Sequence, residues 1–288
     1  MNRKEILERE ARLASYAGYA AIAVPVLFIA STAIVSSISV PDGLATDELR
    51  TFDDNATKIL ASSVFRAASL GLIAVPLYFL FRAAQARSER VIGAMVGFAV
   101  LAPAFLAVQS ILFYAGQDQL ASDFTAAAAP GGDIYTLLDD LAGDSSILIS
   151  AGVAGQLAGL ALIVGMIYVP LQAMRVGLLT RFFGTLGMAL GVAAVLLPAL
   201  TPLPLTLWFG WLGFLILDRV PRGRPPAWDA GEAIPWPSAG REAPKREDGS
   251  SEDVVEGDAT EVFGESQEPK DQSARRERAR KRKRKQRR

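Results

Sequence analysis

Long apolar runs separated by polar loops dominate residues 13–217. Between Arg12 and Asp42 there are 29 residues without a charged side chain. The hydrocarbon core of a bilayer is roughly 30 Å thick, and about 20 helical residues at about 1.5 Å each cross it. This run and the three long runs that follow it predict membrane spans at residues 16–40, 59–81, 91–115 and 145–170.

The last apolar run, residues 182–217, has 36 residues and is too long for one helix of ordinary tilt. Pro198, Pro202 and Pro204 interrupt its middle, and proline suits a turn better than a helix interior. We therefore predict an all-α membrane protein, a six-transmembrane helix bundle. One kinked or re-entrant element is the alternative and would give five spans. The two short spans predicted here are 182–199 and 203–217.

Basic residues lie in every second loop, and the loops between them are acidic. Lys and Arg concentrate in the cytoplasmic loops of membrane proteins. Six spans place all the basic groups on one side, so we expect both termini in the cytoplasm and the protein in the plasma (inner) membrane. Five spans would leave the basic C-terminus outside, which favours six. The basic groups are Arg3, Lys4, Arg9 and Arg12; Arg82, Arg87 and Arg90; Arg175 and Arg181; and Arg219, Arg222 and Arg224.

A faint repeat relates the spans. Pro25 follows Arg12 by 13 positions, and Pro103 follows Arg90 by the same offset. This pattern predicts three helical hairpins of one orientation, like the parallel repeats of some carriers. Chance similarity between spans rich in small residues is the alternative. Before the first span, charge pairs four residues apart predict a short cytoplasmic helix over 1–15.

Three pairs of glycines are spaced four residues apart within the predicted spans. This spacing puts both glycines on one face of a helix, where a neighbouring helix can approach closely. We expect these faces to pack within the chain, with a homo-oligomer contact as the alternative. The pairs are Gly93 and Gly97, Gly155 and Gly159, and Gly187 and Gly191.

Composition excludes several kinds of chemistry. The chain of 288 residues is 51% hydrophobic, has 30 basic and 30 acidic side chains, and has no cysteine and no histidine. It therefore lacks a thiolate nucleophile, an imidazole base and the usual ligands of zinc or haem. No predicted span contains Asp or Glu, which disfavours a proton-coupled carrier. We expect no enzyme activity, no cofactor and no metal site.

Polar residues at membrane depth are the candidate ligand-binding residues, since such residues are costly in lipid. They are Arg66, Gln109 and Gln156. We expect Arg66 to extend to the headgroups or to pair with an acidic residue of the same side, and an anion or headgroup site is the alternative. For Gln156 we expect a helix–helix hydrogen bond rather than a substrate contact. The acidic residues considered for Arg66 are Asp54, Asp118 and Asp144.

The acidic loop before the fourth span has a helical apolar pattern. Ile134, Leu137, Leu138 and Leu141 follow at helical spacing, which predicts an amphipathic helix lying on the bilayer surface. The aspartates of this loop do not have the spacing of a calcium-binding loop, so a solvated acidic surface is expected instead.

The sequence after residue 217 changes to a charged tail. A linker rich in Pro and Trp, 218–240, is expected to rest its indoles at the membrane interface. An acidic tract, 241–274, has too few apolar residues to form a core and is predicted to be disordered. The polybasic tail, 275–288, is expected to bind anionic lipid headgroups, RNA or the ribosome, or an acidic protein or tract, and the alternative is that it has no specific partner. Its basic residues are Arg275, Arg276, Arg278, Arg280, Lys281, Arg282, Lys283, Arg284, Lys285, Arg287 and Arg288.

The six predicted spans, the acidic outer loops and the run RPPAWDAGEAIPWP from Arg224 to Pro237 resemble uncharacterised bacterial multi-pass membrane proteins of unknown function. This resemblance carries no catalytic motif and implies no activity. The sequence therefore favours a non-enzymatic structural or scaffolding membrane protein with a charged tail. A small carrier or a lipid- or anion-binding helical bundle is the alternative.

Overall fold

The computed structural model describes residues 3–38, 45–127, 134–221 and 223–236. The chain divides into two units, 1–241 and 242–288, and all described residues belong to the first. The acidic tract and the polybasic tail lie outside the described residues, so the expectations for them stay predictions.

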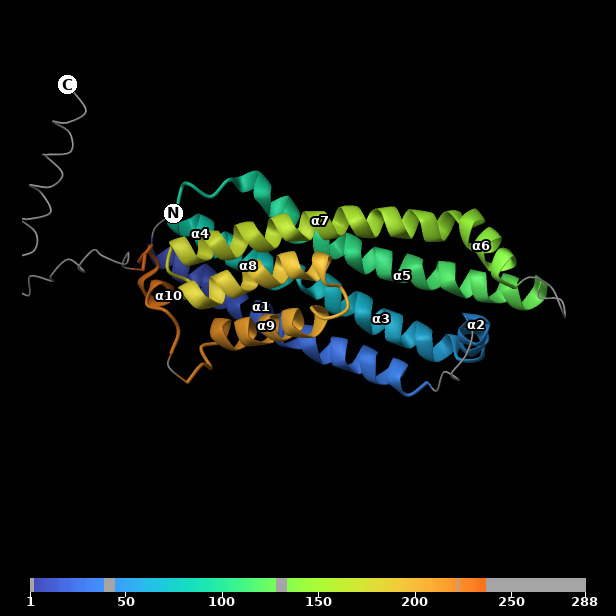
Figure 1. Ribbon diagram of the computed structural model, residues 1–288. Coiled ribbons are helices and arrows are strands. Elements are labelled where there is room, and N and C mark those ends of the chain that lie inside the picture. The colour runs from blue at the N-terminus through green and yellow to red at the C-terminus, as the bar shows by residue number, and fades with distance from the viewer. Residues whose placement is uncertain (1–2, 39–44, 128–133, 222, 237–288) are drawn as a thin grey trace, which may run out of the picture. The chain divides into compact units, whose positions relative to one another are not determined.

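Every regular element among the described residues is a helix (Figure 1), which confirms the all-α prediction. Four helical segments are long and apolar enough to cross a membrane, so the chain is a multi-pass helical membrane protein. They are α1 (Arg3–Ser36), the pair α3 (Ala56–Leu72) and α4 (Ala74–Arg87), the pair η1 (Gly93–Met95) and α5 (Val96–Ala127), and α7 (Ser146–Arg175).

Two shorter apolar helices follow, α8 (Arg181–Leu196) and α9 (Pro202–Ile216). Their 16 and 15 residues are fewer than the roughly 20 that cross a bilayer, so the count of six spans stays a prediction. The bend between them is where the prolines predicted it. Thr201 helps to hold this bend, because its hydroxyl donates to the Ala193 and Leu197 carbonyls.

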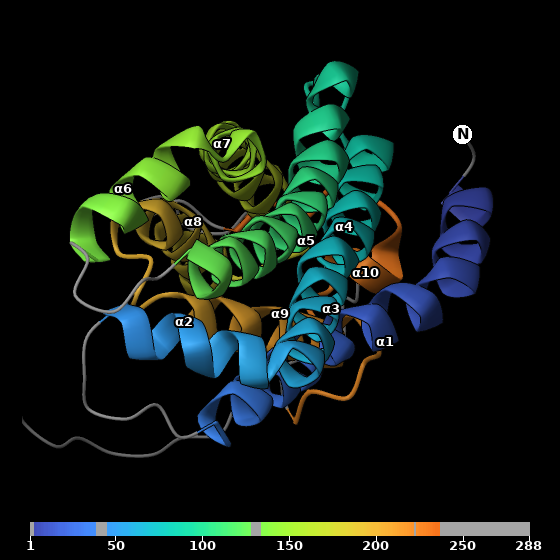
Figure 2. The same ribbon diagram turned by 90° about the vertical axis from the view of Figure 1, so that its right-hand side faces the viewer.

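The long helices α1, α3, α5 and α7 pack side by side in that order. Figure 2 shows them as a curved layer, with α8 and α9 on its concave side. Helix α8 packs on α7 and α9 packs on α1, so the two short helices close the layer into a ring. In Figure 1 this closure covers one part of the bundle only, because α8 and α9 end well short of α2 and α6.

Helix α4 fills the centre of the closed part of the ring. It contacts α1, α5, α7 and α9, and its Leu77, Leu80 and Phe81 are at most 1% exposed. The sequence predicted one continuous span over 59–81, but the helix breaks at Ile73. Pro76 lacks the backbone N–H that would bond to the carbonyl four residues before it, and proline is a common cause of such a break.

The two ends of the ring differ in charge. We call the end where α4 and α7 finish the basic end, and the end that α2 (Ala45–Asp54) and α6 (Ile134–Asp144) cover the acidic end. The basic end carries Arg87, Arg90, Arg175, Arg181, Arg219 and Arg224. The acidic end carries Asp53, Asp54, Asp118, Asp123, Asp139, Asp140 and Asp144.

Two hydrophobic cores stabilise the bundle. The main core surrounds α4 at the basic end, and a smaller core at the acidic end is formed by Leu49, Leu120, Ala121 and Phe124. Leu137, Leu138 and Leu141 of α6 pack against the smaller core. The expectation that their apolar stripe lies on the bilayer surface is therefore wrong for these leucines, because the stripe covers the end of α5 instead.

Candidate functional site

Arg87 at the basic end is a fully buried charge with a complete set of partners. Its side chain is 0% exposed, and its guanidinium forms a two-pronged pair with Glu10, in which Nη2 donates to Oε2 at 2.9 Å. Nε donates to the Ala227 carbonyl at 3.2 Å and Nη1 to the Ala83 carbonyl at 3.0 Å. A buried charge is tolerated when it is paired and hydrogen-bonded in this way.

The chain after α9 folds back over this arginine. We call residues 223–236 the cap segment. Trp228 donates its indole N–H to the Leu178 carbonyl at 2.9 Å, and Trp236 donates to the Leu179 carbonyl at 2.8 Å. The backbone N–H of Ile234 donates to the Val176 carbonyl at 3.1 Å. These three bonds hold the cap segment against the turn between α7 and α8.

The turn that receives these bonds requires glycine. Gly177 has φ of 83°, a region that L side chains rarely adopt. A Cβ atom at this position would lie 2.1 Å from the Ile234 carbonyl oxygen. Backbone conformation and close packing therefore both demand the absence of a side chain here.

Trp228 joins the cap segment to the bundle interior. It is 3% exposed, its ring stacks on Phe79 of α4 at a centroid distance of 5.9 Å, and the Arg87 guanidinium lies 5.8 Å from its centroid. The expectation that this indole rests at the membrane interface is wrong, because protein atoms surround it. The sequence singled out the Trp/Pro run but gave no signal for its partners, since Arg87 and Leu178 are distant in the chain.

The polar residues predicted at membrane depth lie on α3, α5 and α7, consecutive helices of the ring. Arg66 is exposed, and no described residue forms an ion pair or hydrogen bond with it. The expected pairs with Asp54, Asp118 and Asp144 are not formed among the described residues. Within the same ranges Gln156 is also exposed and lacks the expected helix–helix hydrogen bond.

Gln109 of α5 and Gln156 of α7 lie at the same level of the bundle. Its side chain packs on Gly155, where the position of a Cβ atom would lie 3.1 Å from the Gln109 Cδ. Gly155 precedes Gln156 in the chain, so the two amides lie at the same level, but Gln156 points about 100° away from the contact with α5 and is exposed. No described residue hydrogen-bonds the Gln109 amide either. The three predicted ligand residues therefore share the absence of a described protein partner.

Five of the six predicted packing glycines lie against a neighbouring helix. Gly155 faces α5, Gly159 faces Val195 of α8, Gly187 faces Trp208 of α9, and Gly191 faces Met166 of α7. The first pair differs. Gly93 begins the short 3₁₀ helix η1, and a Cβ there would lie 3.4 Å from the Gln85 side-chain nitrogen of α4. A Cβ on Gly97 would meet only Leu101 of its own helix within 4 Å, so these two glycines do not share one helix-packing face among the described residues.

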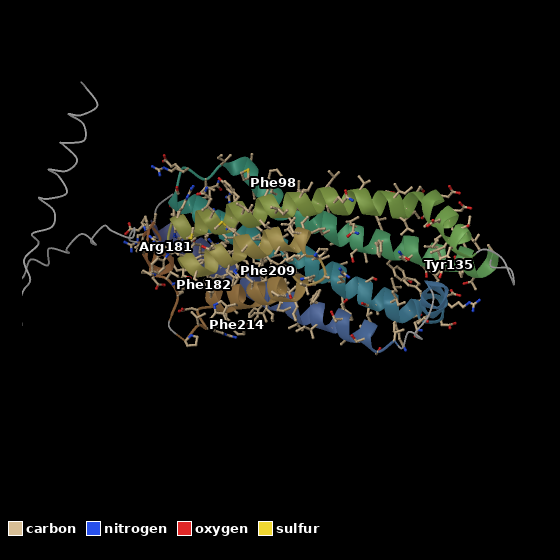
Figure 3. The ribbon with its side chains drawn as sticks, viewed as in Figure 1. Phe98, Tyr135, Arg181, Phe182, Phe209 and Phe214 are labelled. Carbon is tan, nitrogen blue, oxygen red and sulfur yellow. The ribbon has the colours of Figure 1, made fainter. Side chains whose placement is uncertain are left out.

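Aromatic residues mark the two environments at the basic end. Figure 3 labels Arg181 and Phe182 where α8 begins, and Phe209 on α9. Phe182 is 76% exposed on the outer surface, whereas Phe209 is fully buried.

Metal binding is a separate question. Within the described ranges no group of three or more Asp or Glu side chains is arranged to hold a metal ion.

Comparison with protein-family models, with curated proteins and with solved structures found no match, so no family is identified. The class of the protein rests on its own helices, which define an integral, multi-pass helical membrane protein. The features that bear on its function are the basic end and the three polar residues without a described protein partner, Arg66, Gln109 and Gln156.

Proposed function

We propose that the protein is a non-enzymatic membrane anchor of the plasma (inner) membrane, with both termini in the cytoplasm, whose charged tail binds the anionic membrane surface. The observation that supports this proposal is the cap segment. Trp236 is bonded to Leu179 at the basic end of the bundle. The last described residues therefore lie at the end that carries the arginines, which is the end expected to face the cytoplasm.

Electrostatics favour an anionic lipid surface as the partner. Residues 275–288 contain eleven basic side chains. Each contributes about 1 kcal/mol near an anionic bilayer, and a tail fixed to a membrane-embedded bundle stays at high effective concentration beside that surface. RNA would also bind basic residues through its phosphates, but the tail has no aromatic side chain between residues 275 and 288 to stack on bases.

The test compares the full chain with a chain that lacks residues 241–288, each in nanodiscs of neutral phosphatidylcholine. Vesicles containing phosphatidylglycerol are added, and bound vesicles are measured by light scattering. We expect the full chain to capture these vesicles in a salt-sensitive manner and the shortened chain to capture none.

Two control variants separate charge from sequence. A chain with residues 275–288 in scrambled order should bind as the wild type does, because the attraction depends on charge. A chain with those basic residues replaced by serine should not bind. Capture by the shortened chain at the wild-type level contradicts the proposal. Preferential binding of a structureless RNA over the anionic vesicles also contradicts it, and would assign the tail to nucleic acid.

A second candidate function is a lipid- or anion-binding bundle, which includes a small carrier. The observation that favours it is the absence of a described protein partner for Arg66, Gln109 and Gln156. Polar groups at membrane depth are normally satisfied by protein, water or a ligand.

A further inference from the structure

The two hydrophobic cores are separated by a region where inward-facing side chains are exposed. Leu106, Phe113 and Leu120 lie seven residues apart on α5, which places them on one face of the helix. Leu106 packs against the main core, and Leu120 is 7% exposed in the smaller core. Phe113 lies between them and is 48% exposed. We call this region between the cores the mid-bundle opening.

The opening exists because α8 and α9 are short. Val195 near the end of α8 lies against Gly159 of α7. Helix α7 continues toward the acidic end from Ala158 to Ser146, about 20 Å of helix that α8 does not cover. A Cβ atom on Gly152 in this part would meet no atom within 4 Å. Figure 1 shows the short helices ending there, and Figure 2 shows the curved layer from the acidic end.

Helix α1 borders the opening on the other side. Ser31 faces α3, where its hydroxyl is 2.9 Å from that of Ser62, and Pro25 faces Gly210 of α9. At about 100° per residue, Thr32 and Val35 point between these two directions, toward the inside of the ring. Both are nevertheless exposed, and Val35 is 51% exposed.

Arg66 points into the same opening. Ser62, Arg66 and Leu70 follow each other at four-residue spacing on α3, so they share one side of the helix. Ser62 bonds to α1 and Leu70 packs against the main core. Val64 and Phe65 point away from this side and are 51% and 38% exposed on the outer surface. The guanidinium therefore belongs to the inner side of the ring.

An arginine in this place needs an anionic partner. A charged side chain within the hydrocarbon region costs a few kcal/mol when it has no partner. No described residue supplies one here, in contrast to Arg87. The planar guanidinium matches the two oxygens of a phosphate or carboxylate, and it binds them with two parallel hydrogen bonds.

The surroundings indicate where this anion comes from. Phe113, Val35 and Leu106 form apolar walls that suit an acyl chain. Helices α2 and α6 cover the acidic end, and their aspartates repel free anions from the aqueous side. The part of the ring without α8 and α9 lies between α1 and α7, and it faces the bilayer laterally.

We propose that the mid-bundle opening binds an anionic phospholipid, which enters from the bilayer between α1 and α7. Its phosphate binds Arg66, its acyl chains lie against Phe113 and Val35, and the Gln109 amide, which lies against α7, supplies a hydrogen bond from that side of the opening. This inference rests on the second candidate function and is independent of the tail.

The test is native mass spectrometry of the chain that lacks residues 241–288, purified from membranes into a neutral detergent. The apolar helices of residues 1–241 form a separate unit, and removing the tail removes its own lipid binding. Phosphatidylglycerol or phosphatidylcholine is then added. We expect the wild type to retain phosphatidylglycerol, and Arg66→Gln to retain it roughly tenfold less, the loss of one charge-assisted contact. Neither should retain phosphatidylcholine to a comparable degree.

Controls keep each outcome interpretable. Lys58→Gln removes an exposed charge from the same helix and should retain phosphatidylglycerol as the wild type does. Thr32→Trp keeps Arg66 but fills the opening, and should also lower retention. Equal retention by Arg66→Gln and the wild type overturns the proposal. Displacement of the lipid by inorganic phosphate overturns the lipid assignment in favour of a soluble anion. Failure of the tail experiment leaves these results unchanged.

Discussion

Arg87 and Arg66 have the same side chain but opposite surroundings. Arg87 at the basic end is fully buried, pairs with Glu10, and bonds to two backbone carbonyls. Arg66 in the middle of the bundle is exposed and has no partner among the described residues. The difference separates an arginine that stabilises the fold from one that is available to a ligand. Four substitutions test this contrast between the two regions.

Arg87→Ala should have the largest effect. It leaves the Glu10 carboxylate poorly solvated and unpaired, which typically costs about 3–5 kcal/mol. Thermal unfolding in detergent measures this loss. Arg90→Ala is the matched control, because Arg90 is exposed at the same end, and it should change little. The double variant Arg87→Met with Glu10→Met should recover much of the stability. Wild-type stability of Arg87→Ala would show that the pair does not hold the basic end together.

Gly177→Ala should come next. The left-handed backbone costs an L residue about 1–2 kcal/mol, and the Cβ atom would also collide with the Ile234 carbonyl. We expect the cap segment to detach, which proteolysis and Trp fluorescence would detect. Gly223→Ala is the control, because φ there is 71° but no atom lies within 4 Å of a Cβ. Equal behaviour of the two variants would mean that backbone strain alone decides the result.

Ser62→Ala should cost about 1 kcal/mol in thermal unfolding, because it removes a buried hydrogen bond to Ser31. Ser69→Ala removes the bond to the Val24 carbonyl on the same seam, nearer the basic end, and should cost about as much. Equal losses of stability would show that α1 and α3 pack tightly at both serines. If Ser62→Ala is neutral and Ser69→Ala is costly, the contact between α1 and α3 is loose at Ser62, and the mid-bundle opening extends between these two helices.

Arg66→Gln should have the smallest effect on stability, within about 0.5 kcal/mol in neutral detergent, because no described residue forms an ion pair or hydrogen bond with Arg66. The same unfolding assay measures it, beside Arg87→Ala. A loss as large as that of Arg87→Ala would assign Arg66 to the fold, and the contrast between the two arginines would disappear.

Much of the helical architecture could be predicted from the sequence, because a membrane helix needs only local apolar length. The four long helices follow from this rule, and the bend after α8 follows from the local conformational preference of proline. The break at Ile73 was missed although Pro76 was visible, since a proline within an apolar run does not reveal whether the helix continues. The packing of α6 was also missed, because an apolar stripe does not distinguish a lipid surface from a protein surface.

Some residues of the candidate sites could be predicted from the sequence, and others could not. Arg66, Gln109 and Gln156 were found by their polarity at membrane depth, which the sequence contains. The ion pair between Arg87 and Glu10 was not predicted from the sequence, because it joins residues that are 77 positions apart. Sequence patterns of period 3.6 report which face of one helix is apolar and do not report which helix covers it.

The sequence by itself determined that the chain crosses a membrane, that its basic and acidic loops alternate, and that it has neither cysteine nor histidine for chemistry that depends on them. Only the tertiary structure decided that α4 occupies the centre of the ring, that the cap segment covers Arg87, and that Arg66 points into an opening. Hydrophobic length and charge act locally along the chain. Pairing and exposure depend on which distant segments meet. Here α8 and α9 close only one part of the ring, because they are too short to reach its acidic end.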